Sequence, residues 1–320
     1  MSRRVIGIGM SWQADLSNLK EMNQSGEGTI YETDQDWVLK IFHDPEGSQA
    51  GKIDILSKCS SKRTALWDGL RSVATVPEWF VQNEQGKTVG YLMKRIPGSK
   101  TLQSLYNGSS IKDTLQSFIS LHASLSMMHK QGFAVGDLNG GNIMLCQDGN
   151  GMKAWLIDTD SWTINRPDLG IVYCPMIQNQ EVLHPDHLSA KATGQALPAF
   201  IPKHDWWIFS YLLTKCLAGS DPFEHGSFFN FSDTDRRKMG YTAMHRGVDL
   251  GSPEEYAAYV RMGIPMKHLL KRWLSIAQTG PFPINLLQST LEELIRCPNC
   301  RREINGRLVL CPYPDCTTML

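Results

Sequence analysis

The chain has 320 residues, of which 42% are hydrophobic and 20% charged, so it can bury a sizeable core and is not compositionally disordered. Its 32 lysines and arginines balance 32 aspartates and glutamates, which excludes a general affinity for nucleic acid or for an acidic membrane surface. The longest near-apolar run, residues 206–213, is far shorter than the roughly 20 residues that cross a bilayer, and residues 5–10 do not form a secretory signal. We therefore expect a cytoplasmic protein.

The first 97 residues are predicted to be rich in strands. Residues 1–22 have no clear periodicity and are interpreted as an arm. Alternating apolar residues and turn residues then predict strands over 29–31, 37–42, 78–82 and 88–94 and a helix over 49–71. Pro97-Gly98 breaks the pattern and gives the first domain boundary.

The pattern after this boundary is mainly helical. Apolar residues recur every three or four positions from Ile111 to Lys130, and Gly132 ends this helix. Further predicted elements are a strand over 154–158, an irregular segment to about residue 202, and helices over 206–217, 253–262 and 267–277. The chain thus divides into an arm (1–22), a strand-rich lobe (23–97), a helical lobe (98–290) and a cysteine-rich tail (291–320), an α+β plan with two lobes.

Two motifs in the strand-rich lobe are suited to binding phosphate. The first is Gly26-Glu27-Gly28, where glycines let backbone N–H groups approach phosphate oxygens. An ordinary turn between strands is the alternative. The second is Lys40, which lies on an otherwise apolar strand and either reaches solvent from a sheet edge or points its charge into a cleft.

Two motifs in the helical lobe carry carboxylates and amides. Asp137 and Asn142 lie five residues apart in a glycine-containing loop, where a carboxylate can accept a hydroxyl proton and an amide oxygen can ligate a hard cation. An Asx-rich turn is the alternative. Asp158 ends an apolar strand and Asp160 follows it, a costly placement unless a cation neutralises the carboxylates. Mg²⁺ bound by Asn142, Asp158 and, as an extra ligand, Asp160 fits this donor set.

In this order the four motifs resemble the eukaryotic-type protein kinases, over roughly residues 23–290. The resemblance implies a bilobal protein-kinase-like fold that binds ATP with Mg²⁺ or Mn²⁺ between its lobes and phosphorylates Ser or Thr of a protein substrate. It implies that Lys40 and the Gly26–Gly28 loop hold the phosphates, that Asp137 is the catalytic base, and that Asn142 and Asp158 bind the metal.

Further positions match the same family. Met93 matches the gatekeeper residue, and Lys94 to Ile96 matches the hinge whose backbone pairs with adenine. His184-Pro185-Asp186 stands where the activation segment ends. Asp205 matches the aspartate that braces the catalytic loop.

The finer pattern is similar to one bacterial branch of this family. Its marks are Val89-Gly90-Tyr91-Leu92-Met93, Gly136-Asp137-x-Asn139, Asp158-x-Asp160-Ser161 and the cysteine-rich tail. The resemblance implies a signalling module with two partners, a metal-dependent protein phosphatase and a von Willebrand-type protein of the tellurium-resistance kind. No nucleic-acid or membrane partner is expected.

The chain departs from the family pattern at several positions. Val135-Gly136 replaces the His-Arg pair before the catalytic aspartate, so a phosphorylated activation segment has no arginine to bind. Asn139 replaces a lysine, and Thr159-Asp160 replaces Phe-Gly. Between Gly51 and Trp67 the only acidic residue that could pair with Lys40 is Asp54, whose side chain is short. A pseudokinase that senses nucleotide, or a small-molecule phosphotransferase like the aminoglycoside and choline kinases, therefore stays an alternative.

The tail carries a separate metal-binding pattern. Cys297 and Cys300 form one close pair, Cys311 and Cys316 form another, and a predicted hairpin over 303–310 with a turn at Asn305-Gly306 would bring the pairs together. Four thiolates supply a closed tetrahedral site for a structural zinc ion, giving a zinc-ribbon-like module. A redox pair is the alternative, but no thioredoxin-like unit surrounds it.

Overall fold

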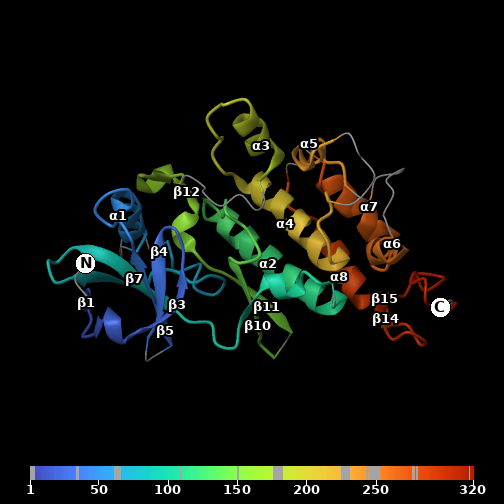
Figure 1. Cartoon of the computed structure of the whole chain (residues 1–320), viewed down its shortest axis with the longest axis horizontal. Helices are drawn as coiled ribbons and strands as arrows, with labels where there is room; N and C mark the ends of the chain where they lie inside the picture. The colour runs from blue at the N-terminus through green and yellow to red at the C-terminus, as the bar shows by residue number, and fades with distance from the viewer. Residues whose placement is uncertain are drawn as a thin grey trace.

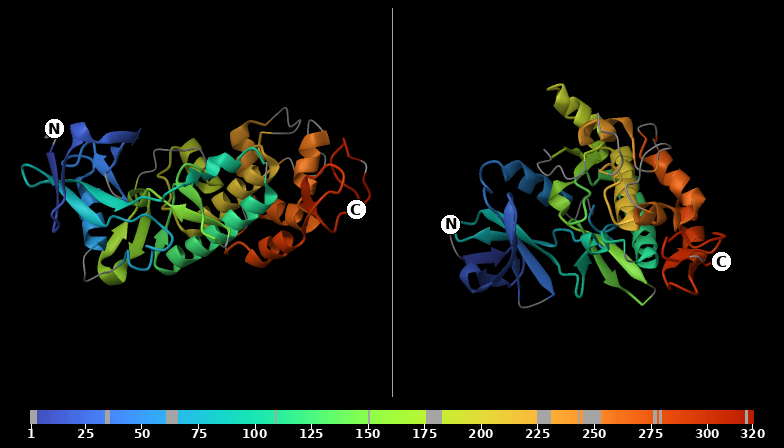
Figure 2. Two further views of the ribbon diagram at one scale, coloured as in Figure 1. Left: turned by 90° about the horizontal axis from the view of Figure 1, so that it is seen from below. Right: turned by 45° about the vertical axis from the view of Figure 1, so that its right-hand side comes forward.

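The computed structural model describes residues 4–33, 36–60, 66–108, 110–149, 151–175, 183–224, 231–242, 244, 253–275, 278, 280–316 and 318–320. A strand-rich lobe lies at one end of the molecule, helices occupy the middle, and the cysteine-rich tail lies at the opposite end (Figure 1, Figure 2). The α+β plan with two lobes and a small C-terminal appendage is thus confirmed. Within the described residues, no helix combines the length and apolarity that crossing a bilayer requires.

The strand-rich lobe is one antiparallel sheet in the order β2-β1-β6-β7-β5-β4-β3. Its strands are β1 (Arg4–Gly7), β2 (Gln13–Asp15), β3 (Lys20–Gln24), β4 (Gly28–Glu32), β5 (Trp37–Phe42), β6 (Trp79–Asn83) and β7 (Thr88–Lys94). The four strands predicted from alternation coincide with β4 to β7 to within one residue. Because side chains alternate across β5, Leu39 and Ile41 pack on one face, whereas Lys40 and Phe42 point to the face that meets the helical lobe.

The interpretation of residues 1–22 as an arm is wrong for the part that the structure describes. β1 pairs with β6, β2 pairs with β1, and β3 pairs with β4, so this segment extends the sheet at both edges. Strands β1 and β2 have only four and three residues, and every residue of β3 is exposed. Short or fully exposed strands leave no apolar alternation in the sequence, which is why the pattern missed them.

One helix, α1 (Ala50–Cys59), follows β5 and is shorter than the helix predicted over 49–71. A polar run over residues 60–64 interrupts the apolar spacing, and residues 61–65 lie outside the described part. Beyond this gap Leu66, Trp67 and Leu70 lie in turns, yet they are buried in the core that continues into the helical lobe. Their spacing reflects burial in that core and not a helix.

The helical lobe is built on α2 (Ile111–Lys130) and α4 (Pro202–Ala218), which contact each other. The prediction for α2 is confirmed, and α4 contains the helix predicted over 206–217. The other helices are α3 (Pro185–Ala192), α5 (Asp233–Met239), α6 (Pro253–Val260), α7 (Ile264–Trp273) and α8 (Ile284–Glu292). Helix α3 lies in the segment expected to be irregular, where its eight residues are too few to show a helical period.

Short strands place the polar motifs of this lobe. Strands β10 (Ile143–Gln147) and β11 (Met152–Leu156) form a hairpin that pairs with β8 (Lys100–Thr101) and contacts α2. A second small sheet contains β9 (Phe133–Ala134), β12 (Thr163–Arg166) and β13 (Ile171–Tyr173). Because the ends of a hairpin meet, the residue before β10, Asn142, lies beside the residues after β11. The Ile157 N–H donates to the Asn142 carbonyl oxygen at 3.0 Å.

The tail contains β14 (Leu294–Arg296) and β15 (Glu303–Asn305), which pair across the first cysteine pair. The hairpin predicted over 303–310 is therefore wrong, because the partner of β15 precedes it in the chain. The tail is docked on the helical lobe: Glu303 accepts from the Lys112 N–H in the first turn of α2, and Arg261 donates to the Tyr313 hydroxyl.

Candidate active site

Lys40 ends in a buried group of carboxylates where the two lobes meet. Its Nζ lies 2.6 Å from Asp158 Oδ1 and 2.8 and 2.9 Å from the two carboxylate oxygens of Asp160. Lys40 is 2% exposed and Asp160 is fully buried, and the Tyr91 hydroxyl also donates to Asp160 at 3.0 Å. Since β5 lies between β4 and β7, Lys40 does not reach solvent from a sheet edge. It points its charge into the joint between the lobes.

The charges of this group shift one another's ionisation. Burial alone would lower the pKa of Lys40, but the negative charges of Asp160 and Asp158 outweigh burial and hold that pKa well above its ordinary value. Burial likewise opposes ionisation of Asp160, yet Lys40 and Lys52 hold its pKa below the ordinary value. Burial and the Asp160 charge raise the pKa of Asp158 to about 6. Asp160 is thus a permanent counter-ion of Lys40, whereas Asp158 gains a proton more readily.

A tight turn separates the two aspartates and gives them different surroundings. Asp158 has a left-handed backbone, with φ 62° and ψ 47°, which a residue with a Cβ rarely adopts. The turn continues through Thr159 to Ser161, whose hydroxyl donates to the Asp158 carbonyl oxygen at 2.8 Å. It returns Asp160 to the interior, while 31% of the Asp158 side chain stays exposed. Only Asp158 of the two is accessible to a ligand.

The loop from Asp137 to Asn142 is held by its own side chains. Asn139 Oδ1 accepts from the N–H groups of Gly141 and Asn142, as in an Asx-rich turn. Asn142 Nδ2 donates to Asp137 Oδ2 at 3.2 Å and to the Asp137 carbonyl oxygen at 3.0 Å. Because its N–H groups face Asp137, Asn142 has its amide oxygen left as an acceptor that suits a hard cation.

Asp205, at the start of α4, braces the chain before this loop. Its two carboxylate oxygens accept from the N–H groups of Val135 and Gly136 at 2.8 and 3.0 Å, and His129 Nε2 lies 2.9 Å away. Asp205 is fully buried. These contacts place Asp205 behind the Asp137–Asn142 loop, as the sequence predicts, and fix the backbone immediately before Asp137.

The glycine motif forms the turn between β3 and β4 and is tied to helix α1. Gln49 Nε2 donates to the Glu27 carbonyl oxygen at 2.6 Å, and Lys52 binds the Glu27 carboxylate. A Cβ at Gly28 would lie 2.6 Å from the Ile41 carbonyl oxygen, so close packing of β4 on β5 requires this glycine. Gly26 shares the turn, and the phosphate-binding role of this loop stays a prediction.

The predicted gatekeeper and hinge lie where β7 leaves the sheet. Met93 is half-buried opposite Val38, Lys94 is exposed, and Ile96 accepts from Ser99 Oγ through its carbonyl oxygen. Their proposed contacts with adenine stay a prediction.

The predicted pairing of Lys40 with Asp54 is wrong. The Asp54 side chain is 61% exposed and pairs with Lys58 one turn along α1. Sequence reasoning also missed Lys52, which is 7% exposed and lies 3.6 Å from Asp160 Oδ2. A lysine in an ordinary amphipathic helix carries no sign of burial, so no sequence signal could have identified it.

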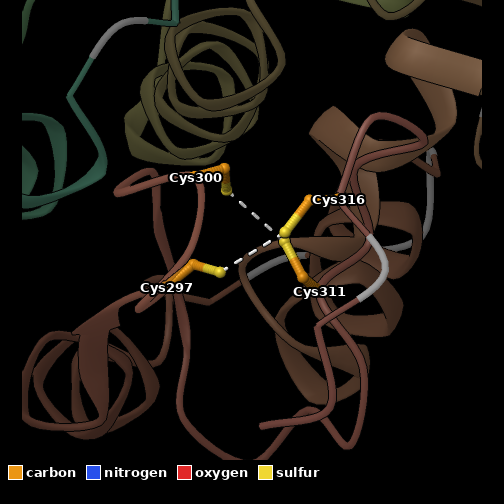
Figure 3. A group of neighbouring side chains, drawn as sticks. All are labelled: Cys297, Cys300, Cys311 and Cys316. Atoms are coloured by element: carbon orange, nitrogen blue, oxygen red, sulfur yellow. Dashed lines mark hydrogen bonds between the residues drawn. The ribbon is translucent and has the colours of Figure 1, made fainter.

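The four cysteines of the tail point towards one another (Figure 3). Cys297 Sγ lies 3.6 Å from Cys316 Sγ, Cys300 Sγ lies 3.7 Å from Cys311 Sγ, and all four sulfurs lie within 4.8 Å of one another. Zn–S bonds of about 2.3 Å at tetrahedral angles separate the sulfurs by about 3.8 Å. The spacing is therefore compatible with a small zinc module.

Comparison with known proteins shows a distant likeness to protein kinases. No family model matches the chain. It is 28% identical over 157 residues to protein kinase YegI of Escherichia coli strain K12, and to the same extent to YegI of strain O157:H7. The match covers 46% of this chain and 23% of each relative, so the chain spans about a quarter of the curated relatives it matches.

The fold matches that of a solved kinase domain. A double mutant of the Mycobacterium tuberculosis PknI kinase domain matches with a TM-score of 0.52 and 12% identity, over 85% of this chain and 93% of that one. The chain therefore has a protein-kinase-like fold and a weak sequence relationship to a bacterial protein kinase.

Proposed function

We propose that the protein is a protein kinase that transfers the γ-phosphate of ATP to Ser or Thr of a protein substrate. The observation that carries the proposal is the direct contact between Lys40 of the sheet and Asp158 of the helical lobe, beside the braced loop that holds Asp137 and Asn142. The hydrogen bond from Ile157 to Asn142 joins that loop to the strand end that carries Asp158. The likeness to YegI, which is named a protein kinase, supports the coarser part of the proposal.

Each residue then has a distinct task. Asp137, half-buried and oriented by Asn142, would accept the proton of the substrate hydroxyl as that oxygen attacks the γ-phosphorus. Lys40 would hold the phosphates and offset their charge. The exposed part of Asp158 and the amide oxygen of Asn142 would hold Mg²⁺, which when bound supplies positive charge beside the phosphate oxygens.

Activity should not require a phosphorylated activation segment. The residue before Asp137 is Gly136, whose N–H binds Asp205, so this position offers no guanidinium to a phosphate group. We therefore expect phosphatase-treated protein to keep its activity. The signalling module with a metal-dependent phosphatase and a von Willebrand-type protein belongs to the same proposal, and co-purification of the three proteins would test it.

The decisive experiment is single-turnover transfer from labelled ATP by the wild type and by Asp137→Asn. The variant should bind nucleotide as the wild type does but transfer phosphate about 10²- to 10⁴-fold more slowly, because it lacks the proton acceptor. Asp54→Asn, on the exposed face of α1, is the matched control. Wild-type binding without transfer would support the nucleotide-sensing alternative, and label found only on a small alcohol or sugar would support the small-molecule phosphotransferase.

A further inference from the structure

We propose that Asp160 positions Lys40 for the nucleotide phosphates, a task that no residue of helix α1 performs in this protein. The inference rests on the proposed function and assigns a role within the same site. It makes Asp160 a positioning residue that acts through Lys40 without touching the substrate.

The first argument is the set of contacts around the Asp160 carboxylate. Oδ1 accepts from Lys40 and from the Tyr91 hydroxyl, and Oδ2 accepts from Lys40 and faces Lys52 at 3.6 Å. The carboxylate is fully buried. Both oxygens are thus engaged by protein cations and a hydroxyl, and the side chain presents no surface to a nucleotide.

The second argument is the charge that α1 presents to the site. Its buried side chain nearest the cluster is a lysine, Lys52, and its acidic residue Asp54 points to solvent. Lys52 bridges the Glu27 carboxylate of the glycine turn and the Asp160 carboxylate. The two ammonium groups therefore lie on the sheet (Lys40) and on α1 (Lys52), and the carboxylates that they bind lie on the turn after β11 and on the glycine turn. Helix α1 therefore contributes a cation, Lys52, that attracts the carboxylates of Asp160 and Glu27, and it does not supply a carboxylate that pairs with Lys40.

The third argument is the difference between the two aspartates that bind Lys40. Asp158 is partly exposed and can exchange Lys40 for a ligand, whereas Asp160 cannot leave without uncovering a buried charge. Lys40 therefore keeps one fixed partner whatever Asp158 binds. A fixed partner limits where the ammonium can lie, which is what alignment with the phosphates requires.

The test compares Asp160→Asn with Asp158→Asn for binding of a fluorescent ATP analogue, both with Mg²⁺ and in EDTA. Asparagine keeps the shape of residue 160 and an oxygen for Tyr91 but loses the charge that holds Lys40. We expect Asp160→Asn to weaken binding about tenfold in both conditions and to raise the KM for ATP, with the Mg²⁺ concentration dependence unchanged. Asp158→Asn should weaken binding only when Mg²⁺ is present. Asp54→Asn should bind as the wild type does.

Two outcomes overturn the inference. Unchanged affinity of Asp160→Asn would show that Lys40 needs no such partner. A loss seen only with Mg²⁺, together with a higher Mg²⁺ requirement, would make Asp160 the extra metal ligand that the sequence predicts. Should Asp160→Asn lose its folded circular-dichroism spectrum, Tyr91→Phe replaces it, since this change removes one hydrogen bond to Asp160 and should raise the KM in the same direction. A wild type that binds no nucleotide would instead refute the proposed function.

Discussion

The ion group at the joint and the cysteine group of the tail are both largely buried, but only the ion group contains its own neutralising charges. Lys40 and Lys52 face Asp158 and Asp160, and Lys40 is 118 and 120 residues from its two partners. The cysteines lie within 20 residues of chain and bring only sulfur to their centre. A group that contains both cations and carboxylates can hold distant segments of the chain together without a bound metal ion. A group of four thiolates needs an added cation to balance its charge.

Removing the metal should have the largest effect, and it should unfold the tail while leaving the lobe that contains the ion group folded. We expect one zinc ion per chain in reduced protein, and we expect Cys300→Ser to lose it. A structural zinc contributes roughly 10–16 kcal/mol of binding free energy to small metal-folded units, more than the core of so short a segment can replace. Hydrogen exchange by mass spectrometry should then show fast exchange over residues 294–320. Because Glu303 caps α2 at Lys112, exchange should also rise at the first turn of that helix.

Cys174→Ser is the control for this experiment. Cys174 is an exposed cysteine directly after β13 and does not belong to the cysteine group of the tail. It should keep the zinc content and the exchange pattern of the wild type. Protein without zinc, or a Cys300→Ser tail that exchanges as slowly as the wild type, would contradict the metal site.

Removing one internal cation should have the next largest effect. Lys40→Met leaves the fully buried Asp160 with the Tyr91 hydroxyl and the more distant Lys52 ammonium as partners, so the free energy of unfolding should fall by roughly 3–5 kcal/mol. Lys52→Met should cost less, about 1 kcal/mol, because its main partner Glu27 is partly exposed. Lys58→Met removes an exposed lysine of the same helix and should change stability by less than about 0.5 kcal/mol. Urea unfolding of the three variants measures the order, and equal effects for Lys40 and Lys58 would contradict it.

The same contrast explains what the sequence could predict. The cysteine pairs can be identified because the ligands of this kind of metal site are close together in the sequence and have a characteristic spacing. The strands around Lys40 are predictable because they are short, mainly apolar segments bounded by turn residues, and the Asp137–Asn142 loop is predictable because its turn residues are neighbours in the chain. In each case the signal lies within about twenty residues of chain.

The partners of Lys40 could not be derived in this way. The sequence places the Asp160 carboxylate near the site. Its pairing with Lys40 depends on a turn that reverses the chain at Asp158. Asp158 has a left-handed backbone, and because it is not a glycine the sequence does not indicate that turn. Lys52 became part of the site only because α1 packs against the turn after β11. Strand β3 was missed because an exposed edge strand has no apolar face. These features arise from packing between distant segments, and one sequence records no such pairing.

A third buried group extends the comparison to side chains that can be neutral. His184, His187 and His204 lie together where α3 meets α4, and all three are buried. His184 Nδ1 accepts from the Asp186 N–H at 3.1 Å and His204 Nδ1 accepts from the Ile201 N–H at 3.2 Å. Each of these rings therefore carries its proton on Nε2 in the neutral form. Uncharged rings bring no net charge to this interior, and the Asp186 carboxylate lies 3.6 Å from His184 Nδ1 and 3.5 Å from His204 Nε2.

Acid should show whether these rings stay uncharged, and for each histidine and each pH unit the expected change in stability is smaller than the two effects above. Burial lowers the pKa of His184 to about 3, that of His204 to about 4, and that of His187 below its ordinary value. Below about pH 6.5 the unfolded chain takes up protons on these rings while the folded protein does not, so the free energy of unfolding falls as the pH drops towards 4. Each histidine contributes up to about 1.4 kcal/mol per pH unit to this fall.

His204→Asn tests this link between burial and acid sensitivity. Its amide oxygen can still accept from the Ile201 N–H, but it cannot titrate, so urea unfolding between pH 6.5 and 4 should show a dependence on pH that is shallower by up to about 1.4 kcal/mol per unit. His268→Asn, at an exposed position of α7, should leave the slope as it is in the wild type. If both variants kept the wild-type slope, His204 would be charged or exposed in the folded protein. The three histidines would then resemble the ion group at the joint, which tolerates buried charge, and not a neutral core.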